Sequence, residues 1–282
     1  MGRTITLERE YPNLHKSVHT IDNMLKQAFP RLIIPVSIVV TWEVLYQFGL
    51  VNEATLSTPS LILLEFVKLI RSGELLVHAW HSLYLIILAF FLSCLAAIPL
   101  GIAMGAKDIF FNLFDPLIEL IRPIPPLALL PLAIVWLGIG VSEKLFILII
   151  GTFPPIVINS YHGVRSTERV LIQAARSMGA SDRDILYKVL FPSALPNIFV
   201  GMQIAIGFAF TVIVAAELVA TQNGLGYLLT IGWRTYNLEM IFVSIIMIGL
   251  LAYLMELILR YVRKKVIKWQ TVNDSPLKTF RR

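Results

Sequence analysis

The stretch that decides the fold is Ser82–Ala106, which reads SLYLIILAFFLSCLAAIPLGIAMGA and contains no charged residue. A helix that crosses a bilayer needs about 20 largely apolar residues. The whole chain matches this stretch, because 57% of its 282 residues are apolar, 15% are charged and the mean hydropathy is +0.76. Soluble domains are roughly 45–50% apolar and about 25% charged. The composition therefore predicts an integral membrane protein.

Six apolar runs are long enough to be membrane-spanning helices. They are Leu32–Leu50, Ser82–Ala106, Pro116–Gly138, Leu145–Tyr161, Asn197–Ala220 and Met240–Val262. We therefore expect an all-α, polytopic transmembrane helix bundle of about six spans over residues 30–265, with tails at 1–29 and 266–282. A further segment, Ser60–Ser72, has helically spaced apolar residues and is expected to lie as an amphipathic helix on the outer surface. No small-residue cleavage site follows the first run, so we expect the first helix to be retained.

The distribution of basic residues predicts the orientation. Nineteen of the 24 lysines and arginines lie at the chain ends and in the loops 107–112 and 162–196, counting Arg260 with the C-terminal end. The three opposite loops carry four, among them Lys68 and Lys144. Cytoplasmic loops of membrane proteins are enriched in lysine and arginine. Both termini and the 162–196 loop are thus expected in the cytoplasm, and the net charge of +6 gives no reason to expect nucleic acid as a partner.

Residues for catalysis or metal binding are missing from the sequence. It has no glycine-rich phosphate loop, no H-E-x-x-H and no C-x-x-C. The single cysteine, Cys94, has no partner for a disulfide. His78 and His81 are spaced to share a metal but lack a third ligand nearby, so a solvated role is expected for both. We predict that the chain is not an enzyme, holds no metal or cofactor, and depends on a partner chain for any use of ATP.

The loop at 162–196 is predicted to form two short helices with a sharp break. Ser166 or Thr167 is expected to cap the first helix, and Gly179 to end it in the left-handed conformation that glycine tolerates. Ser181, followed three residues later by Asp184, is typical of a capping box at the start of the second helix. Pro192 is expected to end that second helix.

The first of these helices carries a narrow apolar stripe. Val170, Ala174 and Met178 lie four residues apart, with Leu171 and Ala175 beside them. Small residues at the centre of a stripe allow another surface to approach closely, as in the binding of a helix in a groove. The alternative is that the stripe packs on the ends of this protein's own helices, and the residues do not decide between the two.

The same loop resembles the E-A-A-x-x-x-G-x(9)-I-x-L-P signature of the membrane subunits of bacterial binding-protein-dependent ABC importers. The signature is present as Gln173-Ala174-Ala175, then Gly179, then Val189-x-Phe191-Pro192. Gln, Val and Phe replace Glu, Ile and Leu, whereas the alanines, the glycine and the proline keep their spacing. The resemblance implies that this loop is the coupling helix that docks on the ATPase subunit. The residues expected to make that contact are Gln173, Ala174, Ala175, Met178, Gly179, Ala180 and Pro192.

More of the chain, roughly residues 55–265, is similar to the taurine, alkanesulfonate, nitrate and bicarbonate permeases. The similar segments are Thr58–Ser60, Arg122–Gly140, Ala215–Leu218 and Gly224–Gly226. The resemblance implies ATP-driven alternating access for a sulfonate or similar oxoanion. It also implies a second permease copy, most simply a homodimer, two ABC ATPase subunits that bind the ATP and Mg²⁺, a periplasmic or lipid-anchored solute-binding protein, and a place among the lipids of the bacterial inner membrane. The alternatives are a permease for a heterocycle such as a thiamin precursor, an ion-coupled secondary transporter and a membrane-embedded enzyme.

Five residues are candidates for the transport pathway or its gates. Pro123 and Pro126, with two further prolines in the third run, predict a broken helix of the kind that transporters place at their pathways. Arg122 either extends to the cytoplasmic interface or acts as an inner-gate charge that meets an anion. Glu217 either faces the substrate or fixes the outer gate by pairing with Arg234 or with backbone donors. Phe208 either lines the pathway or packs within the bundle.

Overall fold

The computed structural model describes residues 33–49, 56–219 and 221–269, and within these residues the chain is helical and contains no strand. It divides into two compact units, Met1–Glu65 and Phe66–Arg282. The all-α prediction is confirmed. The predicted tail at 1–29 and most of the tail at 266–282 lie outside the described residues.

In the first unit, a helix spans Ile33–Gln47 inside the first predicted span. It is shorter than the roughly 20 residues that a perpendicular crossing takes. The carboxylate of Glu43 on this helix accepts hydrogen bonds from the backbone and hydroxyl of Ser60, at 3.2 and 3.0 Å. Helix α3 (Pro59–Arg71) starts there, with Thr58 as its cap, because the Thr58 hydroxyl accepts from the Leu61 N–H at 3.1 Å. The helix predicted over 60–72 is therefore present.

Among the described residues of the second unit, four helices are long and apolar enough to cross a membrane. They are α4 (Glu74–Ala106), α7 (Ser142–Arg165), the continuous helical stretch Asp182–Val219 that ends in α10 (Phe191–Val219), and α12 (Leu238–Val266). A fifth crossing would come from a bent pair, Asp108–Ile121 with Pro126–Leu137, whose axes differ by 82°. These five match the second to sixth predicted spans, with most helices extending beyond the apolar runs.

The third predicted span breaks as the prolines indicated, but its boundaries were wrong. Helix α5 (Asp108–Ile121) already begins in the segment 107–112, which had been expected to be a loop. The apolar residues of α5 lie on one side of an amphipathic helix, so no continuous apolar run marked its start. The chain becomes extended at Pro125 and resumes as η1 (Pro126–Leu129) and α6 (Leu130–Leu137). Pro126 fits the first position of η1 because that position needs no N–H donor.

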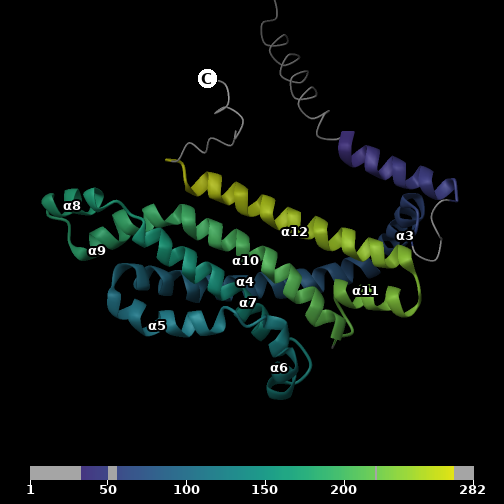
Figure 1. Ribbon diagram of the computed structural model, residues 1–282, viewed down its shortest axis with the longest axis horizontal. Coiled ribbons are helices and arrows are strands. Elements are labelled where there is room, and N and C mark those ends of the chain that lie inside the picture. Colours follow the sequence, from purple (N-terminus) through teal and green to yellow (C-terminus); the bar gives the residue numbers. More distant parts are fainter. Residues whose placement is uncertain (1–32, 50–55, 220, 270–282) are drawn as a thin grey trace, which may run out of the picture. The chain divides into compact units, whose positions relative to one another are not determined.

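Helices α4, α7 and α10 lie side by side and form the centre of the bundle, as Figure 1 shows. Two glycines permit this close approach. A β-carbon on Gly101 would lie 2.5 Å from the Ser160 β-carbon, and one on Gly201 would lie 2.7 Å from the Pro155 carbonyl oxygen. Small residues at such contacts are typical of helix packing in membranes, where close van der Waals contact replaces the hydrophobic effect.

Pro192 does not end a helix, contrary to the prediction. Helix α9 (Asp182–Ile185) runs through a π-helical turn, η2 (Leu186–Leu190), directly into α10. The Phe191 N–H donates to the Leu186 carbonyl, five residues back. This wider turn accommodates the missing N–H and the ring of Pro192, so the helix continues.

Candidate functional site

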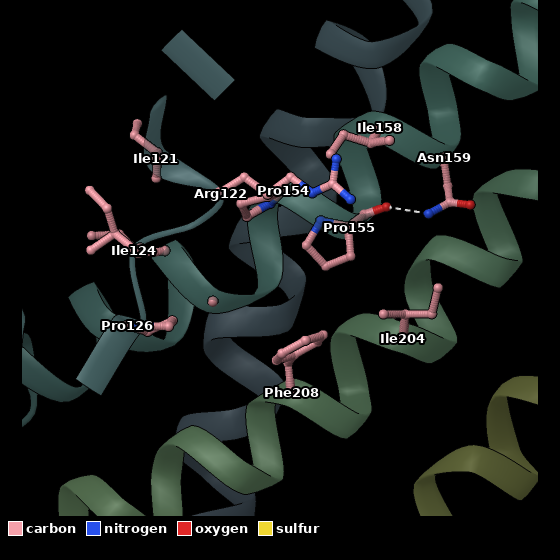
Figure 2. A pocket seen from close by; sticks show the side chains of 12 residues that line it. Ile121, Arg122, Ile124, Pro126, Pro154, Pro155, Ile158, Asn159, Ile204 and Phe208 are labelled. Carbon is pink, nitrogen blue, oxygen red and sulfur yellow. Dashed lines mark hydrogen bonds between the residues drawn. The ribbon is translucent and has the colours of Figure 1, made fainter. Parts of the chain in front are cut away.

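A cavity of about 300 Å³ lies where the broken helix faces α7 and α10. The break contributes Arg122 and Pro126, α7 contributes Pro155 and Asn159, and α10 contributes Phe208 (Figure 2). The structure thus brings three of the five candidate pathway residues, Arg122, Pro126 and Phe208, to one cavity. Pro123 and Glu217 do not line it.

Two polar side chains stand in this otherwise apolar cavity. Arg122 caps the C-terminal end of α5, and within the described residues it makes no ion pair. The Asn159 amide donates one hydrogen bond to the Pro155 carbonyl at 2.8 Å, as the dashed line in Figure 2 marks, and an amide nitrogen carries a second hydrogen. A guanidinium and an amide are both donors that suit an oxyanion. The cavity can therefore hold a small anion with apolar substituents.

Arg122 also borders a second cavity of about 250 Å³ between α5 and α7. Asp115 and Glu119 from α5 line it, together with Tyr161 and His162 from α7. Unlike the first cavity, this one carries carboxylates. Arg122 therefore stands at the boundary between a cavity that suits an anion and one that disfavours it.

Glu217 lies apart from these cavities, in a buried hydrogen-bonded cluster that joins three helices. The residue is 1% exposed, and its carboxylate accepts hydrogen bonds from the Ser82 hydroxyl on α4 at 2.7 Å and from the Gly226 N–H at 2.9 Å. Gly226 belongs to α11 (Leu225–Arg234), a short helix that the sequence analysis did not predict. Of the alternatives for Glu217, pairing with backbone donors is the one observed, and Arg234 is not its partner among the described contacts.

The glycines next to this cluster are required by its geometry. Gly224 has a φ of +116°, and a β-carbon there would collide with the Glu217 carboxylate. A β-carbon on Gly226 would lie 2.5 Å from the Val214 carbonyl oxygen. The Gly224 N–H donates to His78 Nδ1 at 3.1 Å. His78 is thus buried and bonded to the backbone, whereas a solvated role had been expected for it.

Lys144 is also buried, although it had been counted with an exposed outer loop. The residue is 3% exposed, and its ammonium group donates to the Thr221 hydroxyl at 3.1 Å. The carboxylate of Glu143 lies 3.9 Å from the same ammonium group. A buried lysine needs such oxygen partners. Glu143 is the neighbouring residue in the chain, but nothing in the sequence indicated the contact with Thr221, which is 77 residues away.

The predicted coupling segment has the expected break, and its first helix is short, but its second helix is not separate because α9 continues into α10. Helix α8 (Arg169–Ser177) ends before Gly179, whose φ is +82°, and the Ala180 N–H donates back to the Ala175 carbonyl at 3.1 Å. Ser181 and Asp184 form the predicted capping box at the start of α9. The prediction for the start of α8 was wrong, because Glu168 occupies the cap position without a side-chain bond. Ser166 bonds instead to the Gly163 carbonyl on α7 at 3.1 Å.

The apolar stripe of α8 is not covered by the described part of this chain. Val170 is 68% and Met178 82% exposed, and Gln173 and Ala174 are exposed as well. Ala175, at 6% exposure, faces inward instead. Figure 1 places α8 and α9 at one end of the bundle, with α6 and α11 toward the other. The alternative in which the whole stripe packs on this protein's own helices therefore does not hold for Val170, Ala174 and Met178.

A bundle of long apolar helices, a span broken at a cavity and an exposed short helix at one end define a helical membrane permease. The chain belongs to the family described as the binding-protein-dependent transport system inner membrane component, whose sequence profile matches residues 97–268. It is thus the permease of an ABC transporter and a multi-pass membrane protein, and the predicted family is confirmed. Members of this family are transport components and not themselves catalytic.

The chain is similar in sequence to permeases that are named for different substrates. A putative ABC transporter permease of Methanocaldococcus jannaschii is 35% identical over 262 residues, which cover 91% of this chain and 97% of the relative. The taurine transport system permease of Escherichia coli K12 is 35% identical over 81% of this chain and 85% of its own length. A nitrate import permease of Leptolyngbya laminosa is 31% identical over 66% of this chain and 67% of its own length.

A solved structure has the same fold. A chain of the inward-facing methionine ABC transporter MetNI superposes with a TM-score of 0.59 at 23% identity, covering 68% of this chain and 95% of its own. At this level of identity the likeness establishes the fold alone.

Proposed function

We propose that this chain forms the membrane pathway of an ATP-driven importer for a sulfonate, such as taurine or an alkanesulfonate, or for a similar oxoanion such as nitrate or bicarbonate. The observation that carries the proposal is the cavity at the broken helix, where Arg122 and Asn159 stand in apolar surroundings. A sulfonate loses hydration when it enters the bilayer, and charge-assisted hydrogen bonds from a guanidinium offset that cost. Relatives named for taurine, aliphatic sulfonates and nitrate support this choice.

The charges on the two sides of Arg122 suggest a direction of transport. An anion that reaches Arg122 from the apolar cavity next meets the carboxylates of Asp115 and Glu119. Like charges weaken its binding there, which favours release toward the end of the bundle that carries α8. With the basic loops placed in the cytoplasm, that end is the cytoplasmic one, and both chain termini lie on the same side.

The exposed face of α8 supports a docking role toward an ATPase. Val170, Ala174 and Met178 present apolar surface, and Gly179 holds the turn that follows. Two ATPase subunits, each holding ATP and Mg²⁺, would close on ATP binding and move α8 and α9, and that motion would open the spans to the other side. Two copies of this chain would enclose the pathway, and a solute-binding protein would deliver the cargo from outside.

The test is reconstitution of this permease with its ATPase and binding protein in proteoliposomes. We expect ATP-dependent uptake of a labelled sulfonate, with taurine, an alkanesulfonate, nitrate and a thiamin precursor compared as competitors. Competition by the thiamin precursor alone would favour the heterocycle alternative. Uptake by the permease alone, driven by an ion gradient without ATP, would refute the importer in favour of a secondary transporter.

A further inference from the structure

Two cavities adjoin at the end of the bundle near α8, and neither belongs to the pathway described above. One, of about 650 Å³, lies between the ends of α4 and α7 and the helices α8 and α9. The other, of about 520 Å³, runs along α4 toward η2 and the start of α10. Ala106, Lys107 and Leu186 line both, so the two cavities meet at these residues.

The first cavity is basic. Lys107, Arg165, Arg169 and Arg176 line it, against a single carboxylate, that of Asp182. Asp182 lies 3.8 Å from Arg176, and Arg165 pairs with Asp108. Within the described residues, Lys107 and Arg169 make no ion pair. Two positive charges therefore remain for a ligand, which indicates an anion.

A buried hydroxyl also borders this cavity. Thr167 lines the cavity and is 9% exposed, and its Oγ1 has no hydrogen-bond partner among the residues that the structure describes. A buried polar group left unpaired is destabilising. An anionic oxygen in the cavity would accept a hydrogen bond from this hydroxyl and remove that destabilisation.

The second cavity is apolar. Ile98, Ile102, Phe110, Tyr187 and Phe191 line it, and Lys107 is the charged residue among its lining. Its length follows α4, which is one of the membrane-spanning helices. An apolar groove along a membrane-spanning helix suits a hydrocarbon chain better than a soluble ion.

We propose that the two cavities bind one anionic phospholipid. Its phosphate lies near Lys107, Arg169 and Thr167, and an acyl chain occupies the apolar groove along α4. A soluble phosphate would use the basic cavity but leave the groove empty, whereas a phospholipid matches both parts and their junction. The bound lipid would connect α8 to the ends of α4 and α7, so it would influence how motion of α8 reaches the spans. The proposal does not depend on the identity of the cargo.

Native mass spectrometry of the purified, delipidated full-length permease tests this. We expect one phosphatidylglycerol per chain to be retained when that lipid is added back. Phosphatidylcholine should bind about tenfold less tightly, because its choline ammonium cancels the net negative charge that phosphatidylglycerol presents to Lys107 and Arg169. Lys107→Gln with Arg169→Gln should lower phosphatidylglycerol affinity about tenfold or more. The matched control, Arg183→Gln, removes an exposed arginine that lines neither cavity and should leave lipid binding unchanged. If Arg183→Gln lowers phosphatidylglycerol affinity as much as the double variant does, the proposed site is wrong.

Two further variants test the role of the Thr167 hydroxyl and distinguish a phospholipid from a soluble phosphate as the ligand. Thr167→Val keeps the shape of the side chain and should weaken lipid binding severalfold at unchanged thermal stability, whereas unchanged binding would remove Thr167 from the site. Ala106→Phe fills the junction of the cavities and should abolish lipid retention while the protein remains thermally stable. If glycerol phosphate competes as well as the lipid does, and Ala106→Phe leaves lipid binding intact, the ligand is a soluble phosphate and the lipid proposal is wrong.

Discussion

At the scale of single residues, Arg122 is the most direct test of the proposed pathway. Arg122→Gln removes the one cation among the described residues that line the apolar cavity. We expect uptake to fall about tenfold or more, since hydrogen bonds to a charged group are worth roughly 1.5–3 kcal/mol. Arg122→Lys should restore part of the uptake, because the charge is kept while the planar guanidinium is lost. ATP hydrolysis by the complex should persist in both. Uptake by Arg122→Gln equal to that of the unaltered protein would show that Arg122 only extends to the interface.

Glu217 tests a structural role at the same scale. Glu217→Ala leaves the Ser82 hydroxyl and the Gly226 N–H without their acceptor in a buried place, and each such loss costs about 1–3 kcal/mol. We expect the midpoint of thermal unfolding in detergent to fall clearly. Glu217→Gln should lose less, because the amide oxygen still accepts. Glu168→Ala, at an exposed position, is the control and should change little. If Glu217→Ala unfolds at the original temperature, the cluster does not hold α11.

At the scale of elements, the turn after α8 decides whether the α8–α9 segment couples to an ATPase. Leucine at Gly179 strains a left-handed residue by roughly 1–2 kcal/mol, and, apart from its chain neighbours, no described residue lies within 4 Å of its β-carbon. Gly179→Leu should therefore insert in the membrane but lose ATPase co-purification and uptake. Gly73→Leu is the matched control, since Gly73 has a similar φ, +79°, equal space around it and a place before α4. Co-purification and uptake that survive in Gly179→Leu would contradict the coupling assignment.

At the scale of the whole molecule, the proposed orientation can be measured by cysteine labelling. Tyr236, 90% exposed between α11 and α12, and Arg183, exposed on α9, stand at ends that the basic loops assign to opposite sides. In a Cys94→Ser background, an impermeant maleimide should label a cysteine at 236 from outside intact cells and one at 183 only after lysis. Lys144, which a loop assignment would have suggested for labelling, is unsuitable because it is buried. Labelling of a cysteine at 183 in intact cells would show that the orientation is the opposite of the one proposed.

The sequence by itself determined the membrane class, the spans from α4 onward, the break near Arg122 and the turn at Gly179. Each of these depends on residues close together in the chain. A run of about 20 apolar residues requires a bilayer, prolines interrupt a helix where they stand, and the capping box of Ser181 and Asp184 joins residues three apart. The ABC permease family was likewise predicted from the short motif that contains Gly179.

Only the tertiary structure decided which distant residues meet. Ser82 and Glu217 are 135 residues apart, and the burial of Lys144 depends on Thr221, 77 residues away. Helix α11 is too short to give an apolar signal of its own, and it is fixed by the backbone N–H that Gly226 donates to Glu217. The helix continues through Pro192 because the wider π-helical turn before it accommodates a residue that has no N–H to donate. Arg122, Asn159 and Phe208 share a cavity because α5, α7 and α10 pack there, and local patterns contain no information about such contacts between distant helices.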